Sequence, residues 1–147
     1  CFTDAVRATI YVSAIDCWDV QSDTPGQTKL EESIDVWKQL VTGDTFGGTT
    51  IVVLFLNKID LLNKRIKAGD TLRKTYPEYT GSSYSEALGF FKKKHMAFGT
   101  HTKGGARIFV HPTCAIDSKQ ISVILEGVVA NVFANRLSAN KLIASNV

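Results

Sequence analysis

The 147-residue chain lacks a long hydrophobic run and a close pair of cysteines. Its longest uninterrupted apolar stretch has six residues, which is too short to cross a bilayer, and its first residues do not begin a secretory signal. The three cysteines, Cys1, Cys17 and Cys114, form an odd, widely spaced set that argues against a disulfide framework and is typical of reduced thiols. We therefore expect a cytoplasmic protein, and the length suits a single domain with its own core.

The sequence also lacks a large excess of positive or negative charge. The formal net charge is +3 at pH 7, and the densest basic run, Lys-Lys-Lys-His at residues 92–95, falls on an expected helix where a solvated face is the ordinary explanation. Neither feature indicates nucleic-acid binding. The basic run favours at most a weak attraction to anionic lipid headgroups.

Catalytic and phosphate-binding motifs are missing as well. No Gly-x₄-Gly-Lys-Ser/Thr segment occurs; residues 43–49 imitate its glycine spacing, but Thr49 stands where the lysine belongs and the segment follows an expected helix. Gly-x-Ser-x-Gly and Gly-x-Gly-x-x-Gly are absent, which disfavours hydrolase and dinucleotide-binding functions. His111 and Cys114 have no second close pair of ligands beside them. We therefore expect no catalytic residue and no metal ligand in this chain.

What the sequence does contain is a regular alternation of strand and helix patterns. Residues 8–15, 50–56 and 107–110 are β-branched or apolar, as in strands that are buried on both faces. A long helix is expected to begin near Ser118, behind a capping box of Asp117 and Gln120. Strands that alternate with helices predict an α/β fold with a parallel sheet, whose ligands bind beyond the carboxyl ends of the strands.

The helices between these strands each show one apolar face. Gly43 is placed to end the first helix, a short second helix is expected from Leu61, and a third near residues 84–98. The expected buried faces are Leu30, Ile34, Trp37 and Leu40 or Val41 in the first helix, and Leu88, Phe91 and His95 or Met96 in the third.

A polar tetrad, Asn57-Lys58-Ile59-Asp60, directly follows the second strand. Guanine presents two neighbouring donors, N1–H and N2–H₂, which one carboxylate can accept together, and adenine offers no such pair. A bidentate contact of this kind discriminates between bases by roughly 1–3 kcal/mol. Asp60 is therefore the expected specificity residue, Asn57 would brace the loop and offer its amide to the base, and the stem of Lys58 would lie along the purine face.

Four segments together carry a resemblance to one family. They are Cys1-Phe2-x-Asp4, Phe55-Leu56-Asn57-Lys58-x-Asp60-Leu61, Tyr76-Pro77-Glu78-Tyr79-x-Gly81 and Thr113-Cys114-Ala115. Over nearly its whole length the chain resembles the carboxyl-terminal half of a heterotrimeric G protein α subunit. Small Ras-like GTPases share only the second segment, since their last guanine loop usually reads Ser-Ala-Lys, so the combination is specific.

The resemblance implies a fold and a ligand site. Residues 1–147 would be the carboxyl-terminal part of one Ras-like GTPase domain, with three strands and their helices from a P-loop-NTPase-like doubly wound parallel sheet and without its P-loop half. The implied ligand is GTP or GDP. Its base would be held by Asn57, Lys58, Asp60 and the backbone N–H of Ala115, which would donate to guanine O6, in a loop shaped by Thr113 and Cys114.

The resemblance also implies an activity and partners. The chain opens on Cys1, so we expect a partial sequence whose upstream half supplies phosphate and Mg²⁺ binding. The complete protein would be a GTPase, whereas these residues alone should not hydrolyse GTP, because phosphoryl transfer depends on that machinery. The implied partners are a G protein βγ dimer, an effector and a G-protein-coupled receptor that acts through the last helix, at the inner face of the plasma membrane by peripheral association.

A second function stays open at this point. Ten residues follow Asn135-Arg136-Leu137, where the family usually ends shortly afterwards, and Ile116 stands where threonine is common. An α-like interaction module could keep receptor contacts through its last helix while binding nucleotide weakly and hydrolysing none.

Overall fold

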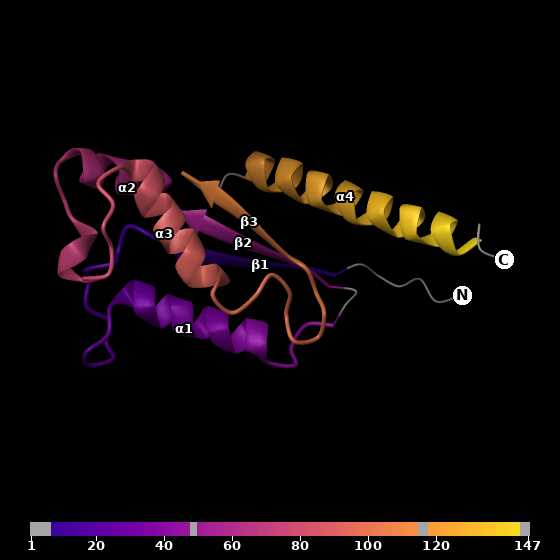
Figure 1. The fold of residues 1–147 in the computed structure, drawn as a ribbon, viewed down its shortest axis with the longest axis horizontal. Coiled ribbons are helices and arrows are strands. Elements are labelled where there is room, and N and C mark those ends of the chain that lie inside the picture. Colours follow the sequence, from indigo (N-terminus) through magenta and orange to yellow (C-terminus); the bar gives the residue numbers. More distant parts are fainter. Residues whose placement is uncertain (1–6, 48–49, 115–117, 145–147) are drawn as a thin grey trace. The chain divides into compact units, whose positions relative to one another are not determined.

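The computed structural model describes residues 7–47, 50–114 and 118–144 (Figure 1). The chain divides into two compact units, Cys1–Ala115 and Ile116–Val147. In the described residues the first unit holds a sheet with its helices, and the second consists of the helix α4, Ser118–Ala144. The start of α4 agrees with the predicted helix, while Asp117 of the predicted capping box lies outside the described residues.

Three strands form a parallel sheet in the order β1-β2-β3 within the described part of the chain. They are β1 (Arg7–Ala14), β2 (Thr50–Asn57) and β3 (Ile108–Thr113). Asn57, the last residue of β2, pairs with Ala14 on one side and with Thr113 on the other. The predicted α/β fold with a parallel sheet is confirmed, and this register aligns the carboxyl ends of all three strands at one edge.

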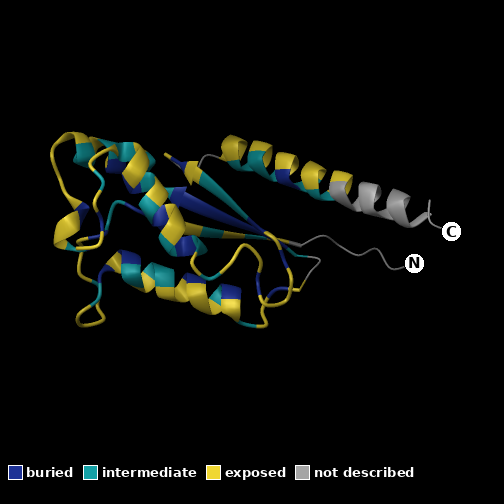
Figure 2. Ribbon diagram, viewed as in Figure 1, coloured by how far each residue is buried: buried dark blue, intermediate teal, exposed yellow. Residues whose placement is uncertain are grey.

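The central strand β2 is the most deeply buried of the three (Figure 2). Its residues from Ile51 to Leu56 are all buried, as expected for a parallel strand flanked on both sides. The side chains of Val52, Leu54 and Leu56 alternate along the strand and join one hydrophobic core.

Three α-helices of the first unit contribute to that same core. They are α1 (Lys29–Thr42), α2 (Ile59–Lys67) and α3 (Tyr84–Met96), with a 3₁₀ turn, η1 (Leu72–Lys74), between the last two. The core residues that they bring to this face of the sheet include Leu30, Trp37 and Val41 of α1, Leu62 of α2, and Ala87 and Phe91 of α3. The predicted Ile34, Leu40, Leu88 and Met96 are partly buried against it.

Local sequence explains where α1 and α3 begin. Each starts with a capping box, in which the N-cap hydroxyl accepts from a backbone N–H and a glutamate three residues later accepts from the N-cap backbone. The pairs are Thr28 with Glu31 and Ser83 with Glu86. Helix α1 ends at Gly43, as its sequence predicts.

Several boundaries differ from the sequence prediction by one or two residues, as at β1 and at the end of α3, and two further differences lie beside the candidate site. The pattern predicts a polar turn from His111, whereas β3 continues through Pro112 to Thr113. Pro112 is tolerated because β3 is an edge strand of the described sheet, where the missing N–H need not face the neighbouring strand. The second helix begins at Ile59 instead of Leu61, so Asp60 lies inside a helix and not in the turn before it.

A buried histidine links α3 to β1 in the core. Nε2 of His95 lies 2.9 Å from Oγ of Ser13, and Nδ1 lies 2.8 Å from the carbonyl oxygen of Phe91. The carbonyl of His95 in turn accepts from Nε1 of Trp37 at 2.8 Å. Since a carbonyl can only accept, Nδ1 carries the proton and Nε2 accepts from the Ser13 hydroxyl. Burial lowers the pKa of His95, against the opposing effect of the bond to Phe91, so the neutral ring is favoured.

This burial predicts a pH dependence of stability. In the unfolded chain a histidine titrates near 6.5, and the folded protein binds the same proton less readily, so the free energy of unfolding should fall as the pH drops below about 6.5. The slope due to His95 is at most about 1.4 kcal/mol per pH unit. The measurement is urea unfolding of the full-length gene product that contains this chain, at several pH values. In His95→Phe the free energy of unfolding should no longer show this slope with pH. His101→Gln, at an exposed position, is the matched control. An unchanged slope in His95→Phe would contradict the assignment.

Candidate functional site

A single residue turns the chain from β2 into α2. Strand β2 ends at Asn57 and α2 begins at Ile59, so Lys58 alone makes the reversal, with φ 64° and ψ 37°. Lys58 is the one non-glycine residue with positive φ in the described part of the chain. A side chain with a Cβ adopts this left-handed conformation at an energetic cost, and such strained residues cluster at binding sites.

Asp60 presents an unengaged carboxylate beside this turn. It lies in the first turn of α2, where the partial positive charge of the helix amino end favours a negative side chain. Asp60 is exposed, and its carboxylate makes no hydrogen bond or ion pair with the described residues. The described residues therefore leave both oxygens to accept from a ligand.

The end of β3 is tied to the end of β2 by a side-chain hydrogen bond. Oγ1 of Thr113 donates to Oδ1 of Asn57 at 3.1 Å. Since Oδ1 is engaged there, the amide NH₂ of Asn57 is turned away from Thr113 and remains to donate. Cys114 follows and is exposed, and the predicted Ala115 lies outside the described residues. The structure thus places the Asn57 turn beside the segment that leads to Ala115.

Asp16 is a residue of this edge that the motif analysis does not identify. It follows β1 by two positions, and the preceding Ile15 donates its N–H to the carbonyl oxygen of Asn57 at 3.2 Å. Oδ2 of Asp16 lies 3.7 Å from Nζ of Lys58, while Oδ1 is buried and has no hydrogen-bond partner among the described residues. An unpaired buried acceptor costs roughly 1–3 kcal/mol, so Asp16 is not explained by stability alone.

Arg65 of α2 fixes the loop that carries Asp16. Nη1 donates to the carbonyl oxygen of Asp16 at 2.8 Å, and the two terminal nitrogens bind the carboxylate of Asp19 at 3.0 and 2.6 Å. Nε donates to Asp70 at 2.7 Å, and Cζ lies 3.7 Å from the ring centroid of Trp18. The hydrogen bond from Arg65 lowers the pKa of Asp19, as expected for a bidentate pair.

The thiols near this edge are free. Sγ of Cys17 donates to the carbonyl oxygen of Ala14 at 3.1 Å, and burial raises the pKa of Cys17, which keeps the thiol protonated. Cys114 is also free, and Cys1 lies outside the described residues.

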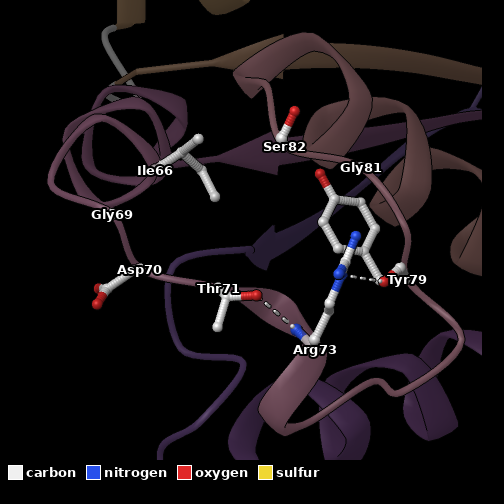
Figure 3. Close-up of a pocket in the computed structure, with 8 residues that line it drawn as sticks. All are labelled: Ile66, Gly69, Asp70, Thr71, Arg73, Tyr79, Gly81 and Ser82. Atoms are coloured by element: carbon white, nitrogen blue, oxygen red, sulfur yellow. Dashed lines mark hydrogen bonds between the residues drawn. The ribbon is translucent and has the colours of Figure 1, made fainter.

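A hollow of about 350 Å³ lies elsewhere, between the end of α2 and the loop before α3 (Figure 3). Arg73, which lines it, is already engaged in hydrogen bonds within the protein. It donates through Nε to the carbonyl of Tyr79 at 3.1 Å and through Nη2 to that of Thr80 at 2.8 Å. The predicted site residues are not part of its lining, which consists of Ile66, Gly69, Asp70, Thr71, Arg73, Tyr79, Gly81 and Ser82. The candidate site is therefore the strand edge and not this hollow.

The chemistry of the strand edge suits a planar, polar heterocycle. Asp60 offers two acceptor oxygens, Asn57 offers an amide donor, and the aliphatic stem of Lys58, whose ammonium is paired with Asp16, offers an apolar surface. These groups all lie at the turn from β2 into α2, so they can address the edge and the face of one ring.

The chain is similar in sequence to known proteins of one family. The family model described as the G-protein alpha subunit matches residues 1–132. The guanine nucleotide-binding protein alpha-2 subunit of Caenorhabditis elegans is 32% identical over 144 residues, which cover 97% of this chain and 39% of the relative. The alpha-4 subunit of Dictyostelium discoideum is 32% identical (93% and 39% covered), and the G(o) subunit alpha of Lymnaea stagnalis is 33% identical (93% and 38% covered). The chain thus spans about two fifths of the length of these relatives.

The bond between Thr113 and Asn57 can be tested by stability measurements. Thr113→Val keeps the shape of the side chain but leaves Oδ1 of Asn57 without its donor, which should lower the free energy of unfolding by about 1 kcal/mol. Thr113→Ser retains the hydroxyl and should restore the bond. Urea unfolding of the full-length gene product measures both variants, and a Val variant as stable as the unaltered protein would refute the role given to this bond.

Proposed function

The chain belongs to the G protein α-subunit family, and on that premise we propose that it forms the base-recognition part of a guanine-nucleotide site. The observation that carries the proposal is the hydrogen bond of Thr113 to Asn57, which joins the ends of β2 and β3, before the two turns that follow them, at one edge of the sheet. Guanine would lie between these turns. The residues proposed to hold it are Asn57, Lys58, Asp60 and Ala115, with Thr113 and Cys114 shaping the second turn.

Asp60 would select guanine. Its carboxylate would accept from N1–H and N2–H₂ together, whereas adenine would set a ring-nitrogen lone pair against it. The exposed carboxylate in the first turn of α2 supports this role, because among the described residues no existing contact would have to break for binding.

Lys58 and Asn57 would complete the contact with the base. The left-handed backbone of Lys58 sends its side chain out from the strand end, where the stem can cover one face of the purine. Asn57, whose Oδ1 is held by Thr113, would turn its amide NH₂ toward the base. The backbone N–H of Ala115 would donate to guanine O6.

The nucleotide in this proposal is GTP or GDP within a larger site. We infer that residues 1–147 are the carboxyl-terminal part of one Ras-like GTPase domain and that the phosphate and Mg²⁺ ligands lie outside them, since no P-loop spacing occurs in the sequence. The GTPase activity would then belong to the whole protein, and these residues alone would not hydrolyse GTP.

The proposed setting is signal transfer at the inner face of the plasma membrane. A G-protein-coupled receptor would act through α4, which begins at Ser118, and a βγ dimer and an effector would be the other partners. We propose a peripheral association with this membrane. A helix that could span a bilayer does not occur among the described residues.

The role of Asp60 predicts a change of nucleotide preference. In the full-length gene product, Asp60→Asn should weaken GDP binding by about 5- to 150-fold, corresponding to roughly 1–3 kcal/mol, and should improve binding of xanthosine diphosphate, whose 2-oxo group suits an amide donor. Competition against a fluorescent nucleotide measures both ligands.

Asp44→Asn is the matched control for this experiment. Asp44 is an exposed acid just before β2, at the amino end of that strand, where it pairs with Lys103. It should keep the guanine preference. Unchanged preference in Asp60→Asn would reject the guanine site and favour the alternative, an α-like interaction module that binds nucleotide weakly and hydrolyses none.

A further inference from the structure

We propose that Asp16 is a positioning residue of the guanine site, whose carboxylate holds the ammonium of Lys58 so that the stem of Lys58 is set for the purine face before nucleotide binds. The inference rests on the function proposed above and adds to it a residue outside the Asn57–Asp60 motif. It follows from where β1 ends, from the contacts of Asp16, and from the anchoring of its loop.

Strand register brings the two charges together. Ala14 pairs with Asn57, and the N–H of Ile15 binds the carbonyl of Asn57 at 3.2 Å, so the chain after β1 runs beside the chain after β2. Asp16 is the next residue after Ile15 in the segment that follows β1, and Lys58 is the next residue after Asn57 in the segment that follows β2. Their side chains meet because these two strands are parallel neighbours.

The contact is an ion pair and not a hydrogen bond. Nζ of Lys58 and Oδ2 of Asp16 are 3.7 Å apart, beyond hydrogen-bond length. The side chain of Asp16 is 17% exposed and that of Lys58 is 47% exposed. The carboxylate is therefore mostly buried, whereas the lysine side chain remains in contact with solvent. The carboxylate draws Lys58 toward the β1 side of the site by charge and leaves its stem uncovered.

The other oxygen of Asp16 argues for a role beyond packing. Oδ1 is buried and makes no hydrogen bond within the described residues. Such a group works against folding, so replacing the charge should not destabilise the protein. A contribution of Asp16 should instead appear in ligand binding, through Lys58.

Arg65 holds both members of the pair in one rigid unit. It binds the backbone of Asp16 and the side chain of Asp19 and stacks on Trp18, so α2 is fastened to the loop after β1. Lys58 is the N-cap residue of the same helix. The carboxylate therefore stays at a fixed place relative to the Cα of Lys58, and only the lysine side chain must be ordered.

Ordering that side chain in advance should strengthen nucleotide binding. A lysine has many rotamers, and a partner that restricts them before binding removes part of the cost of ordering them in the complex. For an ion pair that is partly exposed, we expect a gain of about 3- to 10-fold in affinity for GDP, which should shrink as salt screens the charges.

The test compares Asp16→Asn and Asp16→Glu in the full-length gene product with GDP as the probe. Asp16→Asn should bind GDP about 3- to 10-fold more weakly without a loss of thermal stability in the absence of nucleotide, and Asp16→Glu, which keeps the charge, should recover most of the affinity. The difference between Asp16→Asn and the unaltered protein should narrow at high salt. Asp23→Asn, an exposed acid of the same loop, is the matched control.

A double variant tests whether Asp16 acts through Lys58. Lys58→Met keeps an aliphatic stem without the charge, and in that background Asp16→Asn should have no further effect on GDP affinity. Equal losses in both backgrounds, unchanged affinity in Asp16→Asn, or a fall in thermal stability that parallels the loss of affinity would each overturn the proposal.

The outcome also separates this inference from the function on which it rests. If Asp60→Asn changes the nucleotide preference while Asp16→Asn binds GDP normally, the positioning role alone is wrong. If the unaltered full-length gene product does not bind GDP, both are overturned.

Discussion

The register of β2 between its two parallel neighbours is the constraint on which the site depends. Asn57 pairs with Ala14 on one side and with Thr113 on the other, so the segments that directly follow these three residues begin at the same edge of the sheet. Because side chains alternate with a period of two, a slip of one residue would turn Val52, Leu54 and Leu56 away from the core that they share with the helices. The buried residues of β2 therefore fix the site as well as the fold.

Stability and binding are divided between different parts of the first unit. The core between the sheet and helices α1, α2 and α3 supplies apolar burial, and even its histidine is fully hydrogen-bonded. The strand edge carries the left-handed Lys58 and an oxygen of Asp16 that is buried without a hydrogen-bond partner among the described residues. Arg65 connects the two, since it lies in a core helix and holds the loop of Asp16 in place. Groups that cost folding free energy in this way are commonly found at ligand-binding sites.

Much of this arrangement could be predicted from sequence, because apolar periodicity marks the strands and helices and the Asn57–Asp60 tetrad directly follows a strand pattern. The remainder depends on pairing between distant segments. Asp16 looks like an ordinary loop acid until β1 is placed in register with β2. The extension of β3 through Pro112 depends on its position at the edge of the described sheet. The early start of α2 depends on Lys58 accepting a left-handed conformation, which lysine seldom does.

The most direct measurement is a crystal structure of the full-length gene product with GDP bound. The account predicts both oxygens of Asp60 at about 2.7–3.2 Å from guanine N1 and N2, the stem of Lys58 along the purine face, and the backbone N–H of Ala115 directed at O6. A guanine ring bound away from the carboxyl edge of the sheet, or an Asp60 carboxylate directed away from the ring, would contradict it.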